Sequence, residues 1–129
     1  MRPARSGSSM PTLRDVGEIE AIRRLAAARA AVPPRERGVV VGSGDDAAVL
    51  RPDAANDVIA TTDAFVAGVH YPHRWLAPAA IGARLAAANL SDLAAMAAEP
   101  RWALLSFGAR RDDDLDELVA LEHGVAEAL

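Results

Sequence analysis

The feature that most constrains this chain is a turn rich in glycine and acid between two short apolar runs. The runs are Val39–Val41 and Ala47–Leu50, and the turn between them is Gly42–Asp46. Glycine lets the backbone bend sharply and approach a ligand closely, and flanking β-branched runs favour strands. The sequence therefore predicts two short strands joined by this turn. Its adjacent carboxylates, Asp45 and Asp46, repel each other, so we expect them at the surface or beside a cation.

Three stretches have apolar residues at helical spacing. The predicted helices run from Val16 to about Ala31, from Pro78 to about Ala98, and onward from a cap within Asp112–Asp116. Asp15 is the predicted N-cap of the first helix. Pro78 suits the first turn of the second helix, because its missing N–H has no partner there.

Two further apolar runs, Asp57–Thr62 and Trp102–Phe107, are typical of buried strands. We expect Val58–Thr62 and Ala103–Phe107 to lie side by side, or nearly so, in one sheet. The predicted fold is α/β, a mixed layer of sheet plus packed helices. Residues 1–14 are expected to form a mobile arm, and residues 15–129 to form the domain.

The composition excludes several classes of function. The chain has no cysteine, which excludes disulfides, thiolate metal sites and thiol nucleophiles. All 14 basic residues are arginine, and the absence of lysine excludes the Walker-type phosphate loop and Schiff-base chemistry. The net charge of −4 argues against a nucleic-acid-binding surface. No apolar run has the length of a membrane span, so we expect a cytoplasmic protein without membrane contact.

Four acids with hydroxyl groups beside them form a possible set of oxygen ligands, which suits magnesium. They are Asp45, Asp46, Asp63 and Asp92. Each acid also has a simpler explanation, since Gly-Asp-Asp is a common turn and a helix often exposes a single acid. We predict that the carboxylates of Asp46, Asp63 and Asp92 converge, with Asn89 on the same helix face as Asp92.

Six collinear stretches between Val16 and about Phe107 carry a resemblance to a known family. They are Gly17-Glu18 with Ile22–Leu25, Gly44–Val49, Thr61–Asp63, Val66–Tyr71, Ala88–Met96 and Pro100–Leu104. On these motifs the chain resembles the N-terminal part of the thiamine-monophosphate kinase family, within the aminoimidazole-ribonucleotide synthetase superfamily. The Asn-Leu-Ser-Asp-Leu-Ala-Ala-Met helix and the Gly-Val-His loop are specific to this kinase among its relatives.

The resemblance implies the site and the reaction. The implied magnesium-binding positions are Asp46, Thr61, Thr62, Asp63 and Asp92, with His70 as a substrate contact and with Asp45 and Asn89 as possible site neighbours. The implied reaction transfers the γ-phosphoryl group of ATP to thiamine monophosphate with several magnesium ions and gives thiamine diphosphate. The attacking phosphate is already ionised at neutral pH, so no catalytic base is expected. Without lysine, the charge of the phosphates must be offset by metal ions and arginine. The superfamily also implies a homodimer whose sheets pair into a shared barrel.

The chain departs from the family pattern at three places. Gly42-Ser43 stands where the family usually has Gly-Ile, and Ala97 stands where glycine is common. The sequence ends at Leu129, before the Gly-Gly-Asp-Thr nucleotide motif and the second domain, so we expect a truncated site. Two alternatives stay open: a sister ATP-dependent enzyme of the superfamily, and a non-catalytic dimerising fragment. The Val-His loop favours the thiamine substrate over the sister enzyme.

Overall fold

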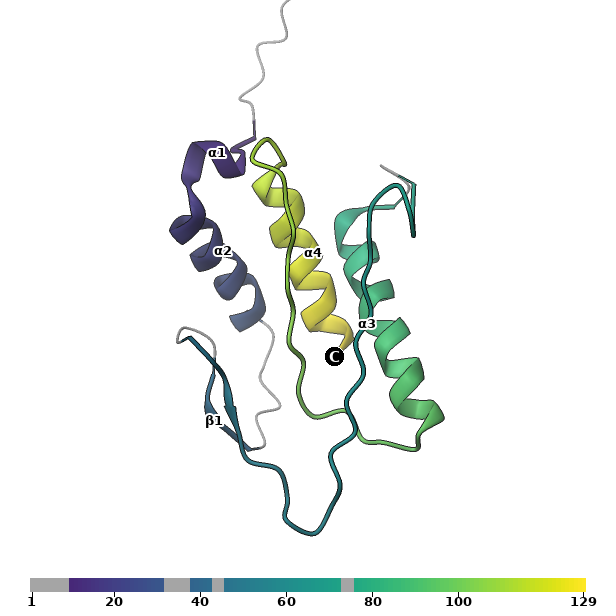
Figure 1. Cartoon of the computed structure of the whole chain (residues 1–129). Helices are drawn as coiled ribbons and strands as arrows, with labels where there is room; N and C mark the ends of the chain where they lie inside the picture. The colour runs from purple at the N-terminus through teal and green to yellow at the C-terminus, as the bar shows by residue number, and fades with distance from the viewer. Residues whose placement is uncertain (1–9, 32–37, 43–45, 73–75) are drawn as a thin grey trace, which may run out of the picture.

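Helices, one short hairpin and two long extended segments make up the part of the chain that the structure describes (Figure 1). The structure is a computed structural model that describes residues 10–31, 38–42, 46–72 and 76–129. The elements are α1 (Leu13–Val16), α2 (Glu18–Ala30), β1 (Val39–Val41), β2 (Val49–Leu50), α3 (Pro78–Ala95) and α4 (Leu115–Ala128). Among the described residues, no helix is long and apolar enough to cross a membrane.

The core of the molecule lies where α4 packs between α2 and α3 (Figure 1). Leu115 at the start of α4 is fully buried, and Val125 and Ile81 are buried where α4 meets α3. Gly82 and Gly124 lie at the crossing, where a β-carbon on either would overlap the backbone of the facing helix. The absence of these two side chains lets α3 and α4 approach very closely.

The second and third predicted helices are confirmed, with shifted ends. Pro78 occupies the first turn of α3, and the Asp114 carboxylate caps α4 by accepting a hydrogen bond of 2.9 Å from the Asp116 N–H. The α3 helix ends at Ala95, because Ala97 adopts a left-handed backbone conformation with φ of 54°.

The first predicted helix is confirmed as α2, which begins at Glu18 rather than Val16, but its predicted cap is wrong. Asp15 lies inside α1, where its carboxylate accepts hydrogen bonds from the Thr12 N–H (2.9 Å) and the Thr12 hydroxyl (2.7 Å). Thr12 is therefore the N-cap, in a capping box with Asp15. These hydrogen bonds lower the pKa of Asp15. Gly17, with φ of 77°, then breaks the helix before α2 begins.

The last residues of the predicted arm are tied to the loop before α4. The Arg14 N–H donates to the Arg111 carbonyl (2.8 Å), and the Leu115 N–H donates to the Pro11 carbonyl (3.0 Å). These hydrogen bonds fix the start of α1 beside the start of α4. The rest of the predicted arm, residues 1–9, lies outside the described residues.

The predicted hairpin is confirmed as a small antiparallel sheet. Val39 pairs with Leu50 and Val41 pairs with Val49, with an irregularity between the two pairs. At the base of the hairpin, the Arg51 N–H donates to the Gly38 carbonyl (2.7 Å), and Gly38 lies against the ring of Trp102.

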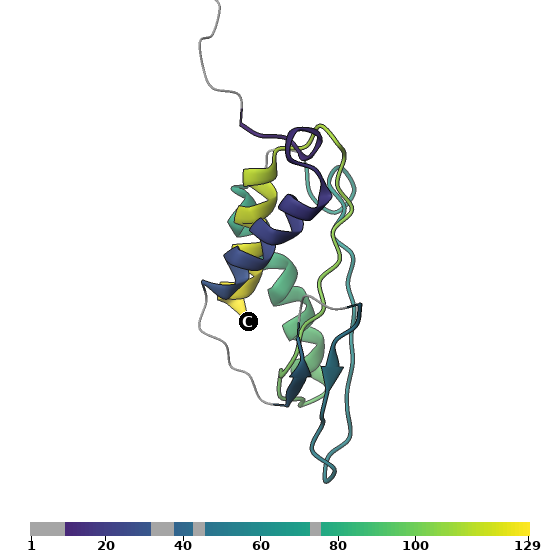
Figure 2. The same ribbon diagram turned by 90° about the vertical axis from the view of Figure 1, so that its left-hand side faces the viewer.

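The two longer predicted strands are wrong as strands. Residues 57–62 and 102–107 are extended, but among the described residues no backbone hydrogen bond joins either segment to a neighbour. The hairpin and these segments lie on one side of the molecule, with the helices on the other (Figure 2). An apolar pattern can predict an extended backbone, but a strand also needs a partner edge, and the described part of the chain provides none here. The fold is therefore helices plus a two-stranded antiparallel sheet rather than one larger sheet.

Candidate functional site

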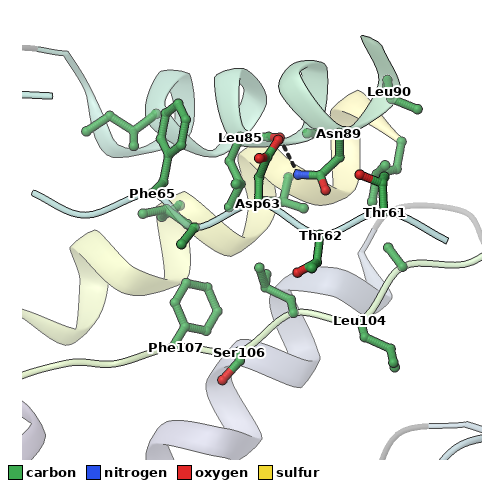
Figure 3. A pocket seen from close by; sticks show the side chains of 18 of the residues that line it. Thr61, Thr62, Asp63, Phe65, Leu85, Asn89, Leu90, Leu104, Ser106 and Phe107 are labelled. Atoms are coloured by element: carbon green, nitrogen blue, oxygen red, sulfur yellow. Dashed lines mark hydrogen bonds between the residues drawn. The ribbon is translucent and has the colours of Figure 1, made fainter. Parts of the chain in front are cut away.

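A broad cleft of about 2260 Å³ separates the two extended segments from α3 and α4. Its walls are mostly apolar, and polar groups enter at Thr61, Thr62, Asp63 and Asn89 (Figure 3). Small-molecule pockets usually have volumes of about 300–1,000 Å³. The cleft is therefore larger than one small ligand requires, and further charged side chains line it elsewhere, among them Glu99, Arg101 and Arg110.

Two of the expected magnesium positions are in direct contact. The Thr61 hydroxyl donates a hydrogen bond of 2.9 Å to the Asp92 carboxylate, although the two residues are 31 positions apart in the chain. Thr61 comes from the extended segment and Asp92 from the last turn of α3, and both residues are exposed. The contact joins the Thr-Thr-Asp segment to α3.

Asp63 and Asn89 form the second polar group of the cleft. Their side chains point toward one another from the extended segment and from α3 (Figure 3). The Asn89 amide donates a hydrogen bond of 3.0 Å to the Leu85 carbonyl one turn earlier, which fixes its orientation. Its amide oxygen then faces away from that bond and can act as a ligand or acceptor.

The predicted convergence of Asp46, Asp63 and Asp92 is wrong for this structure. Among the described residues, no three His, Asp or Glu side chains form a group that could hold a metal ion. Asp46 is exposed on the turn between β1 and β2 and does not line the cleft. Three carboxylates repel one another without a cation between them, which favours this separation. The neighbouring Asp45 lies outside the described residues.

His70 lies in a tight turn that follows the Thr-Thr-Asp segment. Its ring stacks on Phe65, with centroids 6.1 Å apart and planes 6° from parallel. The Val66 N–H donates a hydrogen bond of 3.0 Å to Nδ1 of the ring. Phe65 was missed by the sequence reasoning, although an aromatic residue two positions after Asp63 and five before His70 was the available signal.

Among the described residues, the most deeply buried charge lies outside the cleft, between α2 and α4. The side chain of Glu122 is 5% exposed and forms an ion pair of 3.4 Å with Arg29. Burial raises the pKa of Glu122, and the nearby Arg29 partly opposes this shift. On α2, hydrogen bonds from Arg23 and Arg24 lower the pKa of the exposed Glu20 to about 2. The Arg29–Glu122 ion pair joins α2 to α4, whereas the ion pairs of Glu20 with Arg23 and Arg24 lie within α2.

The donor chemistry around the cleft fits magnesium. Hydroxyl, carboxylate and amide oxygens are the hard ligands that this ion prefers, and no thiolate competes, since the chain has no cysteine. Thr61 and Asp92 already share a contact, and Asp63 and Asn89 line the same cleft from the extended segment and from α3.

Comparison with known proteins assigns residues 44–129 to a family model described as AIR synthase related protein, N-terminal domain. The chain is similar to the thiamine-monophosphate kinase of Synechococcus elongatus, with 43% identity over 67% of this chain and 26% of that protein. It is 35% identical to the kinase of the same name from Corynebacterium glutamicum, over 92% of this chain and 34% of that protein. The one from Caulobacter vibrioides is 40% identical over 79% of this chain and 33% of its own length. The chain thus spans about a quarter to a third of these relatives. No solved structure matches it significantly.

Proposed function

Since this chain belongs to the AIR synthase related family, of which it carries the N-terminal domain, we propose that it supplies the magnesium-binding half of a thiamine-monophosphate kinase site. The reaction is transfer of the γ-phosphoryl group of ATP to the phosphate of thiamine monophosphate. The hydrogen bond between Thr61 and Asp92 is the observation that best supports this proposal, because it joins two of the implied metal positions, one on the extended segment and one on α3.

The site residues divide into those that would hold magnesium and those that would lie beside the metal or the substrate. Thr61, Thr62, Asp63 and Asp92 would hold magnesium, and Asp46 is not assigned to this set because it lies on the hairpin turn and does not line the cleft. Bound magnesium would neutralise phosphate charge and align the two phosphates. Asn89 offers an amide oxygen beside Asp63, and His70 contacts the substrate. No residue is assigned as a general base, because a phosphate monoester is ionised at neutral pH, with its second pKa about 6.

We further propose that two copies of the chain pair along the unpaired extended segments. These segments expose apolar side chains: Leu104 is 84% exposed and Val58 is 61% exposed. Extended backbone without a partner edge is prone to pair with another chain. A second copy would supply that edge and cover the open side of the cleft, which is larger than a small ligand needs.

The test of the proposed reaction is a phosphoryl-transfer assay on the full chain. Radiolabelled ATP, thiamine monophosphate and magnesium are incubated with the wild type, with Asp63→Asn and with a control, Asp53→Asn, in the loop after the hairpin. Labelled thiamine diphosphate formed by the wild type and the control, but not by Asp63→Asn, supports the proposal. Transfer to another acceptor at a higher rate would favour the sister-enzyme alternative.

The second candidate is a non-catalytic dimerising module. The observation that favours it is the exposure of apolar side chains along the extended segments, such as Leu104 and Val58. If the chain dimerises but forms no thiamine diphosphate above the Asp63→Asn background, this second function replaces the first.

A further inference from the structure

Residues 65–71 form a closed turn that is built to hold one side chain. The N–H groups of Val69 and His70 both donate to the Val66 carbonyl, at 3.1 and 2.8 Å. The Gly68 N–H donates to the Tyr71 carbonyl at 2.7 Å, and Gly68 has a φ of 80°, which favours glycine. The backbone therefore returns on itself and brings the His70 ring back over the start of the turn.

The hydrogen bond to the ring determines where the imidazole carries its hydrogen. Since Nδ1 of His70 accepts from the Val66 N–H, the neutral ring carries its hydrogen on Nε2. The described residues provide no second hydrogen bond to this ring, and His70 is exposed. Its Nε2–H is thus a donor directed away from the turn.

Phe65 connects this ring to the helical layer. One face of the half-buried Phe65 is stacked on His70, and Tyr71 lies 5.9 Å away at a tilt of 32°. Phe65 also lines a small hollow of about 350 Å³ against α3, with Arg84, Ala87 and Ala88. A stacked aromatic pair contributes about 0.5–1.5 kcal/mol beyond its buried area. Contacts on both sides hold the Phe65 ring in place, and it in turn restricts rotation of His70.

We propose that Phe65 is a positioning residue for His70. Its ring, together with the Val66 N–H, holds the imidazole in one rotamer and one tautomer, so that Nε2–H donates to an acceptor oxygen of a phosphate-monoester substrate. The substrate part of this statement rests on the proposed function, whereas the positioning of His70 by Phe65 stands on the turn alone.

A preformed donor lowers the cost of binding, because the entropy of one side-chain rotor is lost during folding rather than on ligand binding. Ordering a side chain at an interface costs about 0.5–1.5 kcal/mol. This range of free energy corresponds to a change in Kd of roughly 2- to 10-fold. Loss of the Phe65 ring should therefore weaken substrate binding by that factor. It should leave the groups around Thr61 unchanged.

The positioning is tested by NMR on the full chain labelled with ¹⁵N. An N–H···N hydrogen bond transmits a scalar coupling, which we expect between the Val66 amide nitrogen and Nδ1 of His70. Phe65→Leu should abolish the coupling, and the matched variant Phe65→Tyr, which keeps the ring, should retain it. Absence of the coupling in the wild type, or its persistence in Phe65→Leu, overturns the proposal.

A second measurement keeps the test valid if Phe65→Leu does not fold. In the wild type, the stacking predicts nuclear Overhauser contacts between the ring protons of Phe65 and His70, and their absence also overturns the proposal. Thiamine monophosphate with magnesium is then titrated into the wild type. If the coupling depends on Phe65 but the His70 signals do not move, positioning stands and the substrate role of His70 fails.

Discussion

The close packing at Gly82 and Gly124, where α3 crosses α4, gives the most quantitative prediction. An alanine β-carbon at position 124 would overlap the Ala79 carbonyl oxygen, and one at position 82 would overlap that of Leu121. Both obstacles are backbone atoms, so no side-chain rotation can relieve the overlap. The helices must instead separate by about 1 Å, and overpacking of this kind costs about 1–3 kcal/mol.

For Gly124→Ala we expect an overpacking cost in the upper part of that range, because the two facing backbones are both helical. Alanine recovers about 1 kcal/mol through its higher helix propensity. The net loss is then about 2 kcal/mol, which lowers the melting temperature of a domain of this size by roughly 6–12 °C. The assay is thermal unfolding followed by far-UV circular dichroism. Gly108→Ala is the control, since the space around Gly108 is open and its φ is not left-handed. A Gly124→Ala variant as stable as the wild type would refute the close packing described.

Three other changes test separate parts of the structure. Ala97→Gly should raise the free energy of unfolding by about 0.5–1 kcal/mol in chemical denaturation, because φ is 54° there, whereas Ala95→Gly inside α3 should lower it by a similar amount. Burial raises the pKa of Glu122 above its ordinary 4.5, so the stability that this group contributes is present below pH 4.5 and is lost as pH rises through the folded pKa. The melting temperature of Glu122→Gln minus that of the wild type should therefore increase as pH rises from 4.5 and then become constant. A difference that does not change with pH would contradict this. Leu104→Asp should abolish self-association in sedimentation velocity, and a wild type that is monomeric at tens of micromolar, roughly where weak pairs form, would disprove the pairing.

Helices and the hairpin were predictable because their signals are local. Pro78 and the acids before Leu115 mark helix starts, since each supplies or removes a specific hydrogen bond. The cap at Asp15 was misassigned because the sequence does not show that Gly17 adopts a positive φ. The lack of strand pairing at Val58–Thr62 was not predictable either, because an apolar run specifies an extended backbone but not the strand edge with which it pairs.

The candidate site was predictable where residues share one chain segment or one packed pair of elements. Thr61 and Asp92 meet because the extended segment runs along α3. Asp46 does not join them, because its position depends on where the hairpin sits, and the contacts of the hairpin are at its base, near Gly38. The stacking of Phe65 on His70 depends on the closed turn at Gly68, which is visible only in three dimensions.

Replacement of magnesium by paramagnetic manganese, observed by NMR, tests the central claim most directly. Mn²⁺ at substoichiometric concentration broadens the amide signals of residues near its site. The proposed site predicts selective broadening of Thr61–Asp63 and of Asp92, reversed by excess Mg²⁺ and weakened in Asp63→Asn. Broadening confined to the acidic run Asp112–Asp114, with the signals of Thr61–Asp63 and Asp92 unchanged, would contradict the proposed magnesium site.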